Sequence, residues 1–441
     1  MTSSWSTAWD TAPESSRLMI ERAHDDLLAG SDRRLADIRG LVRDSWRRSM
    51  ANLVGAETLP PLDLDDDALR AYREAHPLAG VMDMVRTLLL PDADSGVVVA
   101  VGDAAGRLLW VEGDTGVRTL TGDVGFVAGA DWSEGAVGTS APGTALQLDR
   151  SVQIRGAEHF NRLVQPWSCT AAPVHDPETR GLLGVIDVTG RDAAATPQAR
   201  LLVDAAARAI ESQLLVARLR ERTTPRRSTP GARHRPGVTA QPAATLRVLG
   251  RDRALLDVAA AGVTRTTELS ARHTEILLML GANREGVSAE QLAELVYGAP
   301  AVDSLRPEMV RLRRVLERAA PQLVPLSRPY RLPIDLETDA QNVVSLLGRG
   351  AHRVALTAYA GPVLPRSDAP GVDELRTRVR ETLREALLAE ASLDVMLAYL
   401  DTADGRDDED ALRLCLRLLP ARSPKRPGIV ARLNSLGNPR G

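Results

Sequence analysis

The stretch that decides the fold of the N-terminal half is Val97-Val-Val-Ala-Val101, followed by Asp103-Ala-Ala-Gly106 and Leu108-Leu-Trp-Val111. Two apolar runs rich in β-branched and aromatic residues flank a short segment of turn residues, which is typical of a β-hairpin. Further strand-like runs follow at residues 168–174 and 182–188. The sequence therefore predicts an antiparallel sheet of about five to six strands.

Helical patterns flank these strands on both sides. Apolar residues recur at helical spacing over residues 14–52 and 65–90, and a longer helix begins at Pro197. In that helix four apolar residues recur four positions apart, namely Leu202, Ala206, Ile210 and Leu214. We expect this helix either to cap the sheet or to pair with a partner chain. The fold class is therefore α+β.

Length and composition divide the chain further. A chain of 441 residues is long enough for two to four domains of ordinary size. Apolar content falls between residues 223 and 245, where prolines, glycines and arginines gather, and this indicates a flexible basic linker. The two cysteines, Cys169 and Cys415, are far apart, and no apolar run reaches the length of a membrane helix. We expect a cytoplasmic protein without a membrane contact.

The segment after the linker carries a local excess of positive charge. Residues 306–331 contain seven arginines and two glutamates, although the whole chain has a net charge of −3. Met309, Leu312 and Leu316 would share one face of a helix there and leave the arginines on other faces. Such a helix suits DNA phosphates and guanine edges. The candidate DNA-binding residues are Arg306, Glu308, Arg311, Arg313, Arg314, Arg328, Tyr330 and Arg331.

Residues 246–335 resemble the winged helix of OmpR-type response regulators and, more closely, that of the antibiotic regulatory protein family. The resemblance is carried by Leu269-Ser-Ala-Arg-His-Thr-Glu-Ile-Leu-Leu278, Val287-Ser-Ala-Glu-Gln-Leu-Ala-Glu-Leu-Val-Tyr-Gly298, Val310-Arg-Leu-Arg-Arg-Val-Leu316 and Tyr330-Arg-Leu332. It implies that the third helix enters the major groove and that the hairpin after it forms a wing. The helical region after residue 335 looks like a shortened version of the activation domain of that family.

The N-terminal half contains a stretch of aromatic, small and polar residues. It consists of Trp132-Ser-Glu-Gly-Ala-Val-Gly-Thr-Ser-Ala-Pro-Gly-Thr-Ala-Leu146, Val152-Gln-Ile-Arg-Gly-Ala-Glu-His-Phe160 and Trp167-Ser-Cys-Thr-Ala-Ala-Pro-Val174. Together with Asp44-Ser-Trp-Arg-Arg-Ser49, it resembles the GAF region of the activators of acetoin and related catabolic operons. The resemblance implies a small-molecule pocket, and its candidate ligand-binding residues are Trp132, Glu134, Thr139, His159, Trp167 and Cys169. Each of these could instead serve packing alone.

These patterns predict five segments. They are an N-terminal helical segment (1–64), a GAF-like sensor (65–222), the linker (223–245), a winged-helix DNA-binding domain (246–335) and a helical C-terminal region (336–441). We interpret the chain as a one-component transcriptional regulator. Its expected partners are double-stranded DNA, an unidentified small-molecule effector, a second copy of the chain and RNA polymerase. The alternative is a sensor or adaptor that acts through protein contacts without DNA binding.

The chain lacks the residues that several enzymatic functions require. A Walker loop requires a lysine after its glycines, and the sole lysine, Lys425, lies in Ser-Pro-Lys-Arg-Pro, which excludes ATP-driven remodelling of polymerase. A methionine sulfoxide reductase would need resolving cysteines close to Cys169. Haem ligation by His159 has weak support because no second motif accompanies it. We therefore expect a protein that is not an enzyme and has no cofactor, and no metal site.

Overall fold

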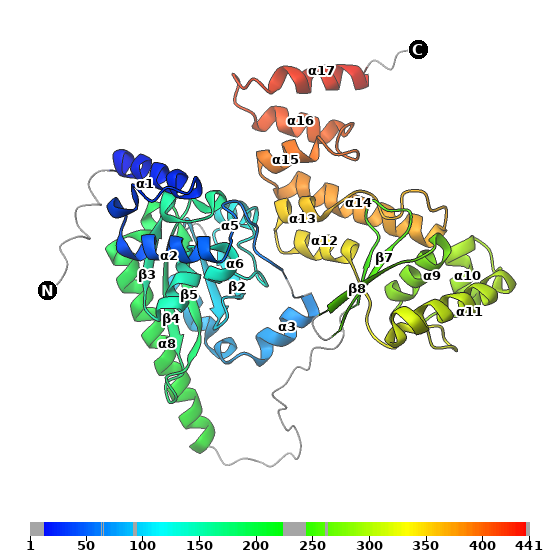
Figure 1. Ribbon diagram of the computed structural model, residues 1–441, viewed down its shortest axis with the longest axis horizontal. Helices are drawn as coiled ribbons and strands as arrows, with labels where there is room; N and C mark the ends of the chain where they lie inside the picture. The colour runs from blue at the N-terminus through cyan, green and yellow to red at the C-terminus, as the bar shows by residue number, and fades with distance from the viewer. Residues whose placement is uncertain are drawn as a thin grey trace. The chain divides into compact units, whose positions relative to one another are not determined.

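The computed structural model describes residues 13–62, 64, 66–90, 95–223, 244–260 and 263–437, and Figure 1 shows its helices and strands in chain order. The chain divides into two compact units, Met1–Ser228 with Arg349–Ala351 and Thr229–Gly348 with His352–Gly441. The predicted α+β, multidomain class with an antiparallel sheet is confirmed. Residues 224–243 of the predicted linker lie outside the described residues, and the limits of the predicted segments stay predictions.

The first unit is built on a five-stranded antiparallel sheet. Its strands are β1 (Val97–Asp103), β2 (Leu108–Gly113), β3 (Val152–Arg155), β4 (Ser168–His175) and β5 (Leu182–Gly190), in the order β2-β1-β5-β4-β3. The predicted hairpin is present, because β1 pairs with β2 in antiparallel register. Gly106 turns this hairpin with a φ of +99°, a conformation that glycine adopts without strain. The central strands β1, β5 and β4 are buried on both faces.

Helices cover both faces of this sheet. One face packs against η2 (Pro77–Val81), α4 (Met82–Leu89) and α8 (Pro197–Thr223), with Val101, Ile186 and Ile210 in the shared core. The other face packs beneath α1 (Pro13–Leu28), α2 (Gly40–Ala51) and α7 (Ala141–Leu148), where Trp46 is fully buried. Alternate residues of β4 serve the two cores, as a strand requires. The shorter elements are η1 (Leu35–Asp37), α3 (Asp66–Ala75), α5 (Thr115–Gly122), α6 (Glu134–Val137), η3 (Gly156–Glu158), η4 (Arg162–Val164) and η5 (Asp192–Ala195).

The long helix α8 covers the sheet, which is one of the two roles that its sequence left open; pairing with a partner chain stays a prediction. Ala206, Ile210 and Leu214 are buried against the sheet, whereas Leu202 is 48% exposed. A spacing of four residues advances by about 40° per step around a helix of 3.6 residues per turn, so that a series of four positions drifts across two faces. The predicted apolar series is therefore divided between a core face and an outward face.

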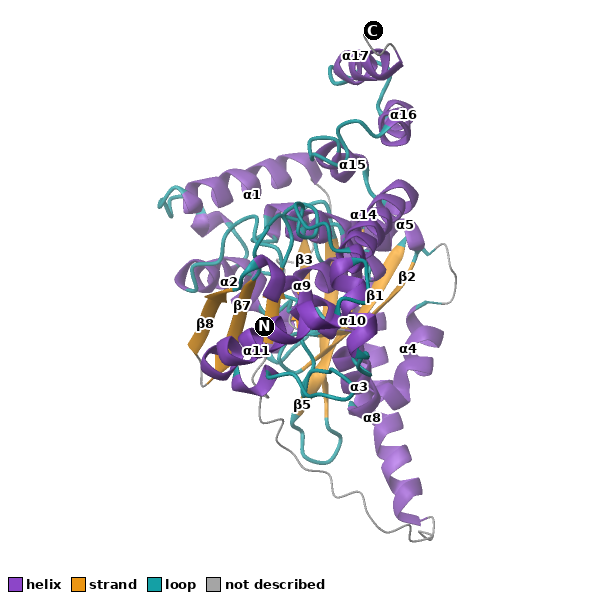
Figure 2. Cartoon of the chain, turned by 90° about the vertical axis from the view of Figure 1, so that its right-hand side faces the viewer, coloured by secondary structure: helices purple, strands orange, loops and turns teal. Residues whose placement is uncertain are grey.

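The second unit begins with a small four-stranded sheet. Strands β6 (Ala244–Arg247), β7 (Leu255–Ala260), β8 (Val263–Glu268) and β9 (Glu337–Thr338) lie in the order β8-β7-β6-β9, with only the β6–β9 pair parallel. Three helices follow β8, namely α9 (Ala271–Ala282), α10 (Ala289–Tyr297) and α11 (Val302–Ala319). Ser270 and Ser288 are the N-caps of α9 and α10, because Ser270 accepts a hydrogen bond from the His273 amide and Ser288 forms a capping box with Gln291. Figure 2 shows β7 and β8 beside these helices.

The remainder of the second unit is helical. After η6 (Pro321–Leu323) and β9 it contains α12 (Asp339–Gly348), α13 (His352–Ala358), α14 (Pro370–Glu390), α15 (Leu393–Tyr399), α16 (Glu409–Leu418) and α17 (Arg426–Gly437). Arg384 of α14 joins this region by binding Asp408, the N-cap of α16, with Nε 2.6 Å from Oδ2. Across the described ranges, every helix is too short or too polar to cross a lipid bilayer.

Candidate functional site

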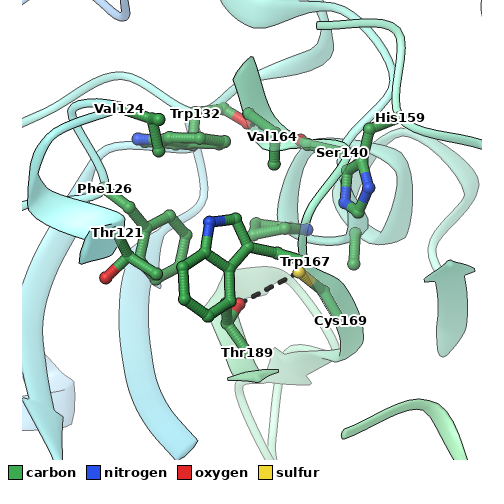
Figure 3. A pocket seen from close by; sticks show the side chains of 12 residues that line it. Thr121, Val124, Phe126, Trp132, Ser140, His159, Val164, Trp167, Cys169 and Thr189 are labelled. Carbon is green, nitrogen blue, oxygen red and sulfur yellow. Dashed lines mark hydrogen bonds between the residues drawn. The ribbon is translucent and has the colours of Figure 1, made fainter. Parts of the chain in front are cut away.

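A buried pocket lies in the first unit, on the side of the sheet that α7 covers (Figure 3). The lining residues come from α5, the loop after it, the start of α7, the segment around η4, and strands β4 and β5; they are Thr121, Val124, Phe126, Trp132, Ser140, Ala141, Pro142, His159, Val164, Trp167, Cys169 and Thr189. The enclosed space is about 10 Å³. This is about the space that one water molecule requires, so the side chains nearly fill the pocket.

His159 gives this pocket its unsatisfied polar atom. The imidazole is fully buried, and Nδ1 lies 3.0 Å from the carbonyl oxygen of Gly156, to which it donates a hydrogen bond. Nε2 is buried and finds no hydrogen-bond partner within the described part of the chain. Burial lowers the pKa of His159 to about 4, so the ring is neutral near pH 7. Nε2 is consequently a hydrogen-bond acceptor at the wall of the pocket (Figure 3).

Aromatic side chains form the walls around that acceptor. The Trp132 indole donates from Nε1 to the carbonyl oxygen of Gly125 at 3.0 Å and packs edge-on against Phe126, with ring centroids 4.8 Å apart. Trp167 is buried, and the guanidinium of Arg191 lies 4.9 Å from its ring centroid. Edge-to-face contacts of this kind fix ring orientation. The walls are thus apolar and defined in shape, as small-molecule pockets usually are.

The strand side of the pocket carries a short chain of polar contacts. The hydroxyl of Thr189 lies 2.6 Å from Oδ2 of Asp187 and 3.1 Å from Sγ of Cys169. Burial raises the pKa of Asp187 to about 7, and its Oδ1 is buried without a partner in the described structure. Burial, with the nearby Asp187 carboxyl, also raises the pKa of the Cys169 thiol well above its usual value. The thiol is therefore protonated and a poor nucleophile at neutral pH.

Two predicted ligand residues lie outside the pocket lining. Glu134 is buried and receives hydrogen bonds from Arg48 of α2, with Nε 2.6 Å from Oε1 and Nη2 3.1 Å from Oε2. The Thr139 hydroxyl lies 2.7 Å from the hydroxyl of Ser45, which also belongs to α2. Both residues attach the segment between Trp132 and α7 to helix α2.

A second attachment joins α2 to the other wall of the pocket. Arg39, the N-cap residue of α2, binds the buried carboxylate of Glu158 through Nε at 2.6 Å from Oε1. The Trp46 indole donates from Nε1 to the carbonyl oxygen of Glu158 at 2.8 Å. Since Glu158 directly precedes His159, helix α2 is connected to both the tryptophan wall and the histidine wall.

The candidate DNA-binding residues cluster at α11 and the loop that follows it. Arg306, Arg311 and Arg314 are exposed, and Met309, Leu312 and Leu316 are buried on the opposite side, as predicted. Glu308 is half-buried, with Oε1 3.2 Å from Nη1 of Arg311. Glu308 thus forms an ion pair with an arginine of the same helix.

The loop after α11 forms a tight hairpin in which Leu326 and Arg331 form an antiparallel bridge. The backbone amide and carbonyl groups of Tyr330 both form hydrogen bonds with the backbone of Val287, the residue before Ser288. Arg313 reaches from α11 to this hairpin, with Nε 3.2 Å from the carbonyl oxygen of Pro325 and its guanidinium 5.9 Å from the Tyr330 ring centroid. Arg328 and Arg331 are exposed on the hairpin. Arg313 is therefore engaged in holding the hairpin against α11.

Sequence reasoning missed most of the pocket lining and Asp187. Phe126, Ser140, Val164 and Thr189 carried no separate signal, because strands and loops far apart in the chain bring them together. Asp187, in contrast, did carry a signal in the sequence. It stands within the apolar strand Leu182–Gly190, where a carboxyl group is costly unless a partner or a function accompanies it.

The N-terminal unit matches known transcriptional regulators. Residues 19–212 match the family model for the MimR N-terminal domain, and residues 392–438 match that for the third C-terminal helical domain of a YTH3-like protein. The acetoin dehydrogenase operon transcriptional activator AcoR of Bacillus subtilis is 31% identical over 193 residues, 42% of this chain and 31% of AcoR. The propane 2-monooxygenase operon transcriptional activator MimR of Mycolicibacterium smegmatis is 30% identical over 197 residues, 44% of this chain and 33% of MimR. The homologues are thus transcriptional activators of the acetoin and MimR type, and the chain matches about a third of each.

A further relative matches nearly the whole chain. The uncharacterized 47.3 kDa protein in the thcA 5′ region of Rhodococcus erythropolis is 39% identical over 407 residues, 90% of this chain and 87% of that protein. The chain belongs to the family of this protein. Among solved structures, the Escherichia coli DhaR(N)–DhaL complex matches at a TM-score of 0.38 and 21% identity, over 42% of this chain and 64% of that chain.

Proposed function

We propose that this protein is a one-component transcriptional regulator that senses a small molecule in the pocket of the first unit and binds DNA through α11. The observation that carries the sensing role is the buried, unpartnered Nε2 of His159 between aromatic walls. A buried acceptor without a partner costs free energy unless a ligand or water satisfies it. Its occurrence in the region that matches the MimR N-terminal domain supports a sensor.

The small volume of the pocket determines how such a sensor would work. At about 10 Å³, the pocket admits an organic molecule only if lining side chains move. The ligand would therefore bind a second conformation and shift the population toward it. Because Glu134 and Glu158 attach both pocket walls to α2, that helix would be the first element outside the pocket to move when the walls move.

The second unit supplies the proposed DNA contact. Arg311, Arg314 and Arg318 are spaced three and four residues apart and are all exposed, so they share one face of α11. The strands, the three helices and the hairpin follow one another in the order of a winged helix, which supports insertion of α11 into the major groove. Arg328, Tyr330 and Arg331 would meet the phosphate backbone from the hairpin. We further propose that the protein acts as a homodimer, and RNA polymerase is the partner expected if it activates transcription.

The test is binding of the full-length protein to the DNA upstream of its own gene. We expect Arg311→Ala with Arg314→Ala to abolish specific binding. The matched control is Arg413→Ala with Arg417→Ala in α16, which removes the same charge from exposed positions of the same unit. Equal binding by both double variants, or no binding by the unmodified protein at low salt, would favour the alternative of an adaptor that acts through protein contacts.

A further inference from the structure

We propose that α8 pairs in parallel with α8 of a second copy of this chain, through an outward stripe of small and apolar residues that we call the α8 seam. The seam consists of Leu202, Ala205, Ala209, Ser212, Val216 and Leu219. This inference rests on the homodimer of the proposed function and assigns the surface and the direction of pairing. It requires neither DNA nor an effector.

The seam lies on a different face of α8 from the one that the sheet covers. The core face consists of Val203, Ala206, Ala207, Ile210 and Leu214, none of which is more than 7% exposed. On the outward face, Leu202 is 48% exposed, Val216 38% and Leu219 49%, and the adjoining Leu201 is 70% exposed. Four large apolar side chains on one surface helix are more than ordinary surface composition explains. Figures 1 and 2 both show the last turns of α8 running past the end of the sheet.

The spacing of the seam is that of a helix that pairs with another helix. Its six members follow one another at intervals of three, four, three, four and three residues. This is the alternation of the a and d positions of a heptad, whose average of 3.5 keeps the stripe facing a partner helix. From Leu202 to Leu219 it extends for about 26 Å at 1.5 Å per residue. A helix that only covers a sheet has no reason to repeat this pattern on its outer face.

The chemistry of the seam suits a dry contact with an equal surface. None of its six members carries a charge. The one hydroxyl, on Ser212, donates to the carbonyl oxygen of Arg208 at 2.9 Å and is therefore satisfied within its own helix. Alanines in the middle of the seam permit close approach of two helix axes. An uncharged surface of this shape is complementary to itself.

Two arginines near the end of α8 pair with acidic residues of the same chain. Arg218 lies with Nη1 2.9 Å from Oδ1 of Asp176, and Arg222 lies with Nη1 2.8 Å from Oε1 of Glu178. Both acidic residues belong to the turn between β4 and β5. These pairs neutralise two of the positive charges near this end of the helix and so lower the repulsion between two copies.

The course of the chain favours parallel pairing. Helix α8 ends at residue 223, and the next described element, β6, begins at Ala244. In a parallel pair both chains leave the dimer at the same end. The 20 intervening residues can span at most about 70 Å, which exceeds the roughly 35 Å between half-sites one helical turn apart. This length permits two copies of α11 to reach one DNA site, and parallel pairing starts both connections from the same end of the dimer.

The experiment uses single cysteines in the full-length protein. Cys169 and Cys415 are both buried, so the unmodified protein should give no disulfide-linked dimer under mild oxidation. We expect Leu202→Cys and Leu219→Cys each to cross-link with itself. The control Arg200→Cys should not cross-link, because that exposed side chain is directed at Ser151 beside β3. Cross-linking of Leu202→Cys only with Leu219→Cys in a mixture would overturn the parallel direction.

Sedimentation provides an independent readout. We expect the unmodified protein to be a dimer at micromolar concentration, and Leu202→Glu with Leu219→Glu to raise the dimer Kd at least tenfold while circular dichroism stays unchanged. The control Leu120→Glu places a charge at another exposed leucine of the same unit and should remain dimeric. A monomeric unmodified protein, or a dimer that both glutamates leave intact, overturns the seam. A seam dimer that fails to bind DNA would instead contradict the proposed function.

Discussion

Arg48 of α2 binds the buried carboxylate of Glu134, with Nε 2.6 Å from Oε1, and Glu134 lies two residues after the pocket tryptophan Trp132. Arg39, the N-cap residue of the same helix, binds Glu158, which directly precedes His159. Arg48 of α2 and Arg39 at its N-cap, nine residues apart, are thus attached to the two walls of one pocket. An ion pair of this kind fixes geometry as much as it adds stability. Helix α2 and the pocket therefore cannot move independently.

Loss of one of these attachments should destabilise the first unit. Since Arg48 remains partly exposed while Glu134 is buried, we expect Glu134→Gln to lower the free energy of unfolding by about 1.5–3 kcal/mol, the range for a hydrogen bond to a charged group. Urea denaturation followed by tryptophan fluorescence measures this loss. The control is Glu21→Gln, which breaks the exposed pair with Arg17 and should cost below about 0.5 kcal/mol. Equal losses in both variants would show that the Arg48 pair is an ordinary surface contact.

The buried Asp187 should make stability depend on pH. Its pKa in the folded protein is about 7, above the unfolded value near 4, so the folded state holds an extra proton between these values. The stabilisation that comes from this bound proton is therefore complete below about pH 4 and is lost as pH rises through about 7. The free energy of unfolding falls by roughly 1.4 kcal/mol per pH unit for one proton. His159 acts in the opposite sense, because its folded pKa of about 4 makes stability rise between about pH 4 and 6.5.

The variant Asp187→Asn separates these two effects. Asparagine does not titrate, so the free energy of unfolding of Asp187→Asn, relative to that of the unmodified protein, should increase as pH rises from about 5 to 8. Denaturant midpoints with matched slopes at several pH values measure the difference. A difference that stays constant over this range would mean that Asp187 is already ionised in the folded protein at low pH.

His159 should remain neutral, with its proton on Nδ1, in mildly acidic solution. The hydrogen bond to Gly156 fixes this tautomer, and burial opposes protonation down to about pH 4. Histidine NMR spectra recorded from pH 8 to 5 should show no titration of His159 and an unprotonated Nε2. Replacement by His159→Phe identifies the resonance. Titration near the ordinary value of 6.5 would show that the ring is accessible to solvent and that the pocket is open.

Neighbouring arginines of α11 should differ in their effects. Arg314 is exposed, so Arg314→Ala should weaken DNA binding, lower the salt dependence by about one phosphate contact and leave stability unchanged. Arg313 contacts Pro325 and Tyr330, so Arg313→Ala should also lower the unfolding free energy by about 1 kcal/mol or more. Binding isotherms at several salt concentrations and thermal unfolding measure the two quantities. Identical stability losses would place both side chains in the same structural role.

The sequence alone determined the features that depend on local pattern. Strand composition predicted the hairpin of β1 and β2. Periodicity also predicted the buried side of α11, because a single helix in contact with one core shows a single stripe. These features depend on neighbours in the chain, which the sequence displays directly.

Only the tertiary structure decided which side chains meet. It placed Trp132, His159, Trp167 and Cys169 around one pocket and turned Glu134 and Thr139 toward α2 instead. It also added Asp187 and Thr189, which reach the site from an adjacent strand, and divided the apolar residues of α8 between a core face and the α8 seam. Such outcomes depend on the register of strands and the packing of helices between distant segments. Local periodicity carries no information about either.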